Sequence, residues 1–142
     1  MTKDVLVSIK GLQYSLEDAE GEDQRIETMN RGKYAFKNGH DIIAFDEYYD
    51  ADVTVKNLIK FNDDFVEVNK KGPYNVTMLF EEGKKNFTNY NTPFGAISVG
   101  LDTESIKVER TPDAIDVYVT YNMEINGGFL ARSEIEIHIS SV

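Results

Sequence analysis

Apolar and polar residues alternate with a period of two along most of the chain. The alternation is clearest near the C-terminus, over residues 115–125 and 129–139, where apolar residues alternate with charged or polar ones. Because successive side chains of a strand point to opposite faces of a sheet, this period predicts half-buried β-strands. Apolar residues almost never recur at intervals of three and four, so we predict no helix except a short turn around Thr103.

Turn-forming residues separate the alternating segments. Asn38-Gly39 suits a two-residue hairpin turn, because both central positions favour a positive φ, and Asn126-Gly127-Gly128 closes the last hairpin. We interpret the least strand-like run, residues 89–95, as a corner at which Pro93 ends one strand and Gly95 permits a bend. Asp102-Thr103 is predicted to form a further turn between two short strands.

One face of each predicted strand is apolar and the other is charged, so the fold must bury a single face of a long meander. An antiparallel up-and-down β-barrel of roughly eight to ten strands does so without a long exposed edge. We therefore predict an all-β fold with a single barrel domain over residues 1–142, and a β-sandwich is the alternative.

The charge of the chain argues against several classes of partner. Its formal net charge is −10, and no run of lysine or arginine exceeds two residues. Nucleic acid and anionic membranes would be repelled, so we expect neither as a partner. The chain has no cysteine, which excludes disulfides and Cys-ligated zinc and favours the reducing cytoplasm. No signal peptide and no run of about 20 apolar residues is seen, so we expect a cytoplasmic protein.

No motif in the sequence indicates catalysis or metal binding. His40 lies in a turn and His138 on the charged face of the last strand, and no His-x-His pair is present. The Gly-x-Ser-x-Gly turn that carries a serine nucleophile is also absent from the sequence. Asp46 and Glu47 are adjacent in a strand and therefore point to opposite faces. We assign no catalytic residue, no metal site and no cofactor.

Two polar residues stand among apolar neighbours on the face predicted to point inward. Glu47 shares a face with Phe45, and Asn57 falls between Val55 and Ile59. An unpaired buried polar group costs about 1–3 kcal/mol, so both need partners. The structural interpretation is an internal hydrogen-bonded pair or a strand end near solvent. The functional interpretation is a polar anchor in a ligand cavity, for which a barrel of this size has room.

The same functional interpretation adds two residues at the predicted barrel mouth. Tyr90 and Thr92 belong to the corner run and could line the entrance to such a cavity. The candidate ligand-binding residues are thus Glu47, Asn57, Tyr90 and Thr92.

Three short runs resemble the YwiB-like family, small bacterial proteins of unknown function. They are Lys56-Asn57-Leu58-Ile59-Lys60, Met78-Leu79-Phe80-Glu81-Glu82-Gly83 and Tyr90-Asn91-Thr92-Pro93-Phe94-Gly95. The likeness extends along nearly the whole chain, but where that family tends to place an arginine this sequence has Lys70-Lys71-Gly72. The resemblance implies a closed or nearly closed antiparallel barrel of the calycin (lipocalin-like) type and a cytoplasmic bacterial setting. It implies no activity.

Three functional hypotheses follow. The first is a non-catalytic intracellular barrel that binds a small, partly apolar molecule. The second is a protein-interaction or homodimer module, which would use outward-facing apolar residues: Leu58, Leu79, Tyr118 and Leu130. An enzyme is the third. The sequence leaves open whether the protein is a monomer or a homodimer.

Overall fold

The protein folds into β-strands throughout the part of the chain that the structure describes. The computed structural model describes residues 1–11, 27–50, 52–73, 75–92 and 95–142, and no helix occurs in these ranges. The strands are β1 (Asp4–Lys10), β2 (Glu27–Lys37), β3 (His40–Asp50), β4 (Val53–Phe61), β5 (Phe65–Lys71), β6 (Val76–Glu81), β7 (Lys85–Thr92), β8 (Gly95–Arg110), β9 (Ala114–Ile125) and β10 (Gly128–Ser141). The predicted all-β class is confirmed.

All ten strands belong to one antiparallel sheet in the order β6-β5-β4-β3-β2-β1-β10-β9-β8-β7. Strands β6 and β7, at the two edges of this sheet, are joined by side-chain hydrogen bonds. The Thr88 hydroxyl of β7 donates to the Thr77 carbonyl of β6 at 2.5 Å, and Asn86 Nδ2 donates to Glu81 Oε1 at 3.2 Å. The sheet therefore forms a nearly closed antiparallel barrel, as predicted.

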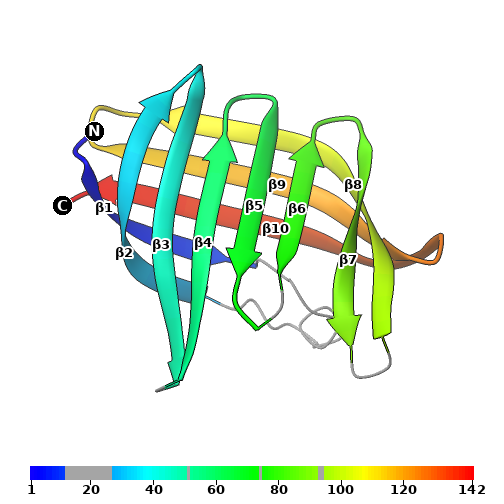
Figure 1. The fold of residues 1–142 in the computed structure, drawn as a ribbon. Coiled ribbons are helices and arrows are strands. Elements are labelled where there is room, and N and C mark those ends of the chain that lie inside the picture. The colour runs from blue at the N-terminus through cyan, green and yellow to red at the C-terminus, as the bar shows by residue number, and fades with distance from the viewer. Residues whose placement is uncertain (12–26, 51, 74, 93–94) are drawn as a thin grey trace.

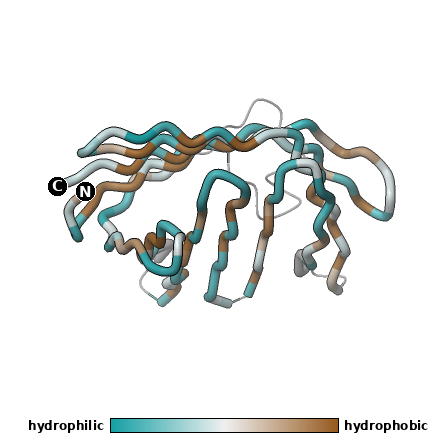
Figure 2. The backbone as a smooth tube through the Cα atoms, turned by 90° about the horizontal axis from the view of Figure 1, so that it is seen from above, coloured by the Kyte–Doolittle hydropathy of each residue, from teal (hydrophilic) through white to brown (hydrophobic). Residues whose placement is uncertain are grey.

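The barrel is flattened into two layers whose strands cross at a steep angle (Figure 1). Strands β3 to β7 form one layer, and β1, β10 and β9 form the other, while β2 and β8 pass from layer to layer. Figure 2 shows the layers from above, with the interior between them. The largest fully buried side chains include Phe61, Phe80 and Tyr121, and the rings of Phe80 and Tyr121 meet edge-on at 4.8 Å across this interior.

Strand β8 corrects the prediction of a turn at Asp102-Thr103. The strand runs without a break from Gly95 to Arg110, and a β-bulge lies between Thr103 and Ser105, where neither a turn nor a helical turn forms. A bulge bends a strand sharply while leaving it paired, which lets β8 change layers here. The turn before β7 is hydrogen-bonded to this bulge: the Gly83 amide donates to the Thr103 carbonyl at 2.9 Å.

Strand β10 contains a second bulge, between Phe129 and Ala131. The extra residue reverses the alternation at the start of the strand. Leu130, predicted to face outward, packs against the core, whereas the Phe129 side chain is 68% exposed. The two predicted hairpin turns are confirmed: Asn38 and Gly39 have φ values of 53° and 77°, and Asn126 and Gly127 have 51° and 80°. Within the described ranges, no helix is long and apolar enough to cross a membrane.

Candidate functional site

A buried polar network lies inside the barrel at the predicted inward positions. Asn57 Nδ2 donates to Glu47 Oε1 at 2.7 Å, so these two predicted site residues are in direct contact. Lys70 Nζ donates to Glu47 Oε1 at 2.8 Å and to Asn57 Oδ1 at 2.7 Å. All three residues are buried, with exposed fractions of 7% or less. The network thus combines an ion pair with an amide that contacts both charges.

Lys70 is the member of this network that the sequence reasoning missed. It follows Val66 and Val68 at intervals of two, and both valines are fully buried, so the alternation already placed Lys70 on the inner face. Its contact with Asn57 follows from the pairing of β4 with β5, in which the two residues stand directly opposite each other. Buried charges are tolerated when they are paired and hydrogen-bonded, and this geometry meets both conditions.

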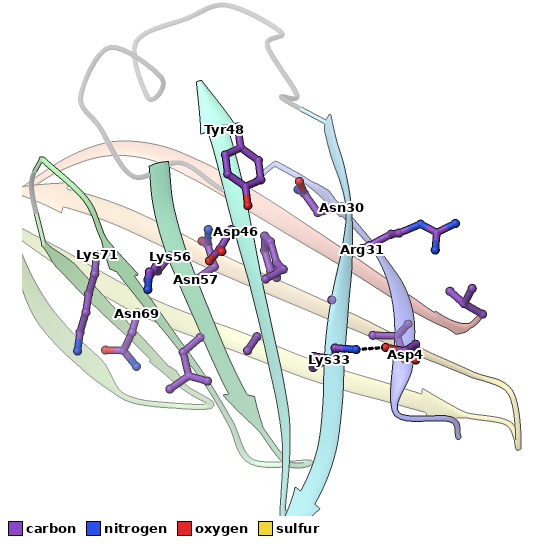
Figure 3. A pocket seen from close by; sticks show the side chains of 16 residues that line it. Asp4, Asn30, Arg31, Lys33, Asp46, Tyr48, Lys56, Asn57, Asn69 and Lys71 are labelled. Atoms are coloured by element: carbon purple, nitrogen blue, oxygen red, sulfur yellow. Dashed lines mark hydrogen bonds and ion pairs between the residues drawn. The ribbon is translucent and has the colours of Figure 1, made fainter. Parts of the chain in front are cut away.

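A cleft opens where β2 separates from β3. The two strands pair only from Lys33 to Lys37 on β2, opposite His40 to Ala44 on β3. From Glu27 to Lys33, β2 pairs with β1, while β3 pairs with β4 from Asp41 to Asp50, so beyond Ala44 β3 no longer pairs with β2. Figure 3 shows the strands diverging from this point. We call the resulting hollow the β2–β3 cleft.

Gly32 lies where the two strands are still close together. A Cβ atom at this position would lie 2.9 Å from the Ala44 carbonyl oxygen and 3.3 Å from the Phe45 Cβ. Both distances are shorter than ordinary van der Waals contacts, so a larger residue would force β2 away from β3. Gly32 therefore permits the close approach that marks the closed end of the cleft.

The β2–β3 cleft has a volume of about 1060 Å³ and a mixed lining. Apolar contacts come from Val5, Ala44, Phe45 and Leu58. Buried Asn57 also lines the cleft, and it connects the cleft to the network of Glu47 and Lys70. Ligand pockets in proteins commonly have volumes of about 300–1,000 Å³ and combine apolar walls with a few fixed polar groups.

Charged residues on the outer side of the cleft are predominantly basic. They are Arg31, Lys33, Lys56 and Lys71, with Asp4 and Asp46 as the carboxylates. Lys33 and Asp4 form an ion pair, shown dashed in Figure 3. Both partners are more than 60% exposed, so solvent screens this pair and it adds little stability.

A second polar cluster closes another part of the barrel around Asp41. This residue is fully buried, and its Oδ1 accepts a hydrogen bond from the Tyr34 hydroxyl at 2.5 Å. Its Oδ2 accepts from Arg110 Nη2, also at 2.5 Å, so the cluster links β2, β3 and β8. The Arg110 guanidinium also lies 5.8 Å from the ring centroid of Phe61.

Two members of this cluster, Tyr34 and Arg110, have raised pKa values. Desolvation, followed by the hydrogen bond and the charge of Asp41, raises the pKa of Tyr34 to about 12. The hydrogen bond to Asp41 is also the main cause that raises the pKa of Arg110. Tyr34 and Arg110 therefore both keep the protons that they donate to Asp41.

The remaining predicted candidates fall partly outside the described residues. The backbones of Tyr90 and Thr92 belong to β7, where they stand opposite Ile97 and Gly95, but their side chains lie outside the described part. Strands β5 and β6 lie between β4 and β7, so the structure does not bring this backbone next to Asn57. Pro93 and Phe94 are also outside the described residues.

The histidines and acidic residues give no metal site in the described ranges. The His40 ring contacts the Phe65 ring edge-on at 5.2 Å, and His138 Nδ1 lies 2.5 Å from Asp116 Oδ1 on the outer face. No group of three or more potential ligands converges among the residues that the structure describes.

Comparisons with known proteins extend over nearly the whole chain. Residues 7–137 match the family model described as "Domain of unknown function (DUF1934)". The crystal structure of the ywiB protein from Bacillus subtilis superposes with a TM-score of 0.78 at 19% sequence identity. The match covers 99% of this chain and 92% of that one, which establishes a common fold and confirms the resemblance predicted from the sequence. Among curated proteins, none matches the sequence.

Proposed function

The chain belongs to the DUF1934 family, whose function is unknown, and we propose that it is a non-catalytic barrel that binds a small, partly apolar molecule in the β2–β3 cleft. We place this binding in the cytoplasm, as the cysteine-free sequence predicts. The observation that carries the proposal is the cleft itself, which combines a volume of about 1060 Å³ with apolar walls and a fixed polar group.

The buried network supports this proposal by holding Asn57 in one orientation. The Asn57 Nδ2 group donates to Glu47 and, at 3.3 Å, to the Val55 carbonyl, while its Oδ1 accepts from Lys70. The side chain, which lines the cleft, therefore has its amide already oriented by buried partners. A polar group fixed by buried partners loses little conformational freedom on binding, which favours affinity.

A neutral fluorescent probe tests the cleft. N-phenyl-1-naphthylamine becomes fluorescent in an apolar site, and we expect it to bind the wild-type protein with saturation. Ala44 is exposed and lines the cleft between Lys33 and Leu58, so Ala44→Trp would fill the cleft from its outer side. We expect this variant to lose most of the saturable signal.

A matched control separates filling of the cleft from the addition of a tryptophan. Ala96 is also exposed, on β8 beside β7, and does not line the cleft. Ala96→Trp should bind the probe as the wild type does. The proposal fails if the wild-type protein shows no saturable binding, or if both variants bind equally well.

A second candidate function is self-association through an outer sheet face. Phe87 and Phe129 are 70% and 68% exposed. Pairing of β7 to β10 places Phe87 opposite Gly100, Gly100 opposite Glu124, and Glu124 opposite Phe129, so both rings belong to one row. Light scattering of the wild type and of Phe87→Ser/Phe129→Ser tests this candidate. A homodimer that the double variant dissociates would support it, and a strictly monomeric wild type would contradict it.

A further inference from the structure

We propose that the molecule bound in the β2–β3 cleft is an anionic amphiphile, whose acidic head group is held by Lys56 and Lys71 while its apolar part lies along Ala44 and Leu58. This inference rests on the proposed function and specifies the chemical class of the ligand. Carboxylate, sulfonate and phosphate heads share the required chemistry, which is a compact negative charge that accepts hydrogen bonds from ammonium groups.

The first observation is a pair of like charges in direct register. Lys56 on β4 stands opposite Lys71 on β5, and both side chains are exposed on the outer face of the sheet. Figure 3 shows both on the same side of the cleft, with Asn69 beside them. Like charges directly opposite each other destabilise a pair of strands. An anion placed between the two ammonium groups would remove this repulsion.

The second observation is the contrast between the cleft and the rest of the chain. The protein carries a formal net charge of −10, yet the cleft is lined by four basic and two acidic side chains. Of the two carboxylates, Asp4 is paired with Lys33, and Asp46 on β3 stands opposite Lys56. Within the described part of the chain, neither Lys56 nor Lys71 forms an ion pair. A concave site with an excess of one sign attracts ligands of the opposite sign, even on a protein whose total charge would repel them.

The third observation is the position of the apolar wall relative to the lysines. Leu58 follows Lys56 at an interval of two on β4, so both point to the outer face. Ala44 stands directly opposite Leu58 on β3. The outer-face apolar strip of Ala44 and Leu58 thus begins next to the ammonium groups. A ligand with a charged head and an apolar body would fit this order of groups.

Two probes with one aromatic body test the inference. 8-Anilinonaphthalene-1-sulfonate differs from N-phenyl-1-naphthylamine by its sulfonate group. We expect the wild-type protein to bind the sulfonate about fivefold to tenfold more tightly, with the difference decreasing as salt increases, because exposed charge pairs contribute modestly and are screened. Lys56→Gln/Lys71→Gln should remove this preference by lowering the affinity for the sulfonate more than the affinity for the neutral probe.

The control variant removes the same charge elsewhere. Lys60 lies on β4, opposite Glu67, and Lys37 lies at the β2–β3 hairpin, and neither lines the cleft. Lys37→Gln/Lys60→Gln should keep the preference for the sulfonate within about twofold of wild type. Equal melting temperatures of the two double variants would show that both remain folded.

The outcomes separate the inference from the proposed function. If both probes bind with equal affinity and Lys56→Gln/Lys71→Gln changes neither, the inference is overturned while small-molecule binding in the cleft stands. If the two double variants lose the preference equally, the effect comes from net charge and the inference is again overturned. If neither probe binds in a saturable way, the proposed function fails and the inference fails with it.

Discussion

Lys70 and Glu47 form an ion pair inside the barrel, with 2.8 Å between Lys70 Nζ and Glu47 Oε1. Their side chains are only 4% and 9% exposed, so water screens the pair very little. Removing one partner of such a pair leaves an uncompensated buried charge, whereas removing both leaves none. We therefore expect that losing one of the two charges destabilises the barrel more than losing both.

Replacing Lys70 tests this dependence. We expect Lys70→Met and Glu47→Gln each to lower the free energy of unfolding by about 3–5 kcal/mol, because each removes one of two opposite charges that stabilise each other inside the barrel. Urea denaturation followed by far-UV circular dichroism gives both values. The double variant should lose less than the sum of the two single variants, with a coupling energy of about 2 kcal/mol or more. Additive effects would contradict the interpretation of a coupled buried pair.

For two inward-facing threonines, we predict that replacement by valine changes the free energy of unfolding in opposite directions. Both Thr103 and Thr88 are buried, but the Thr103 hydroxyl has no hydrogen-bond partner among the described residues, whereas that of Thr88 donates to the Thr77 carbonyl. Valine has the same shape without the hydroxyl. Since an unsatisfied buried hydroxyl is costly, Thr103→Val should raise the free energy of unfolding by about 1 kcal/mol.

The matched variant is Thr88→Val, which removes a hydrogen bond between β7 and β6 where the barrel closes. It should lower the free energy of unfolding by about 1 kcal/mol. Thermal and urea denaturation of the two variants side by side measure the difference. Equal destabilisation by both substitutions would show that the Thr103 hydroxyl is satisfied in solution.

Gly32 controls the closed end of the cleft. We expect Gly32→Ala to lower the free energy of unfolding by about 1–3 kcal/mol, because its Cβ would press on the Ala44 carbonyl and the Phe45 side chain. Gly100→Ala is the control, since a Cβ there meets nothing closer than 3.4 Å. This second variant should be within about 0.5 kcal/mol of wild type. Similar losses for both would indicate that the approach of β2 to β3 is not tight.

Tyr34 makes the stability depend on pH in the alkaline range. Its pKa is about 12 in the folded protein, against the ordinary value of 10.0 expected in the unfolded chain. Between these values the unfolded chain loses the phenolic proton while the folded protein keeps it. The contribution of Tyr34 to stability is therefore fully present below pH 10 and is lost as the pH rises toward 12.

A comparison with Tyr34→Phe isolates this contribution from the other groups that titrate at high pH. The free energy of unfolding should fall more steeply from pH 10 to 12 in the wild type than in the variant. In addition, the difference between their phenolate absorbance titrations at 295 nm should have its midpoint near 12. A midpoint near 10 would show that burial and Asp41 do not raise the pKa of Tyr34.

Much of the candidate site was accessible from the sequence because alternation is a local property. The period of two placed Glu47 and Asn57 on the inner face, and the structure finds both there in mutual contact. Whether either contacts a ligand stays a prediction. Lys70 and Asp41 carry the same signal, since each alternates with buried apolar residues on its strand, although charged side chains are seldom fully buried.

The cleft could not be predicted in this way. Its existence depends on β2 leaving β3 at Gly32 and joining β1, which is a matter of pairing between strands. The like-charged pair of Lys56 and Lys71 depends on the register of β4 against β5. The bulges that expose Phe129 and bend β8 at Thr103 also leave no clear signal in the local sequence. A bulge is an extra residue in one strand of a pair, so it is defined only by comparison with the partner strand.

The sequence by itself determined most of the strands with their inner and outer faces, apart from β8 and the start of β10, and the two hairpin turns at Asn38-Gly39 and Asn126-Gly127. These features follow from the preferences of single residues and near neighbours. Only the tertiary structure decided which polar side chains meet inside the barrel and where its wall opens. Those contacts join residues from different strands, and register and layer crossing bring them together after the chain has folded.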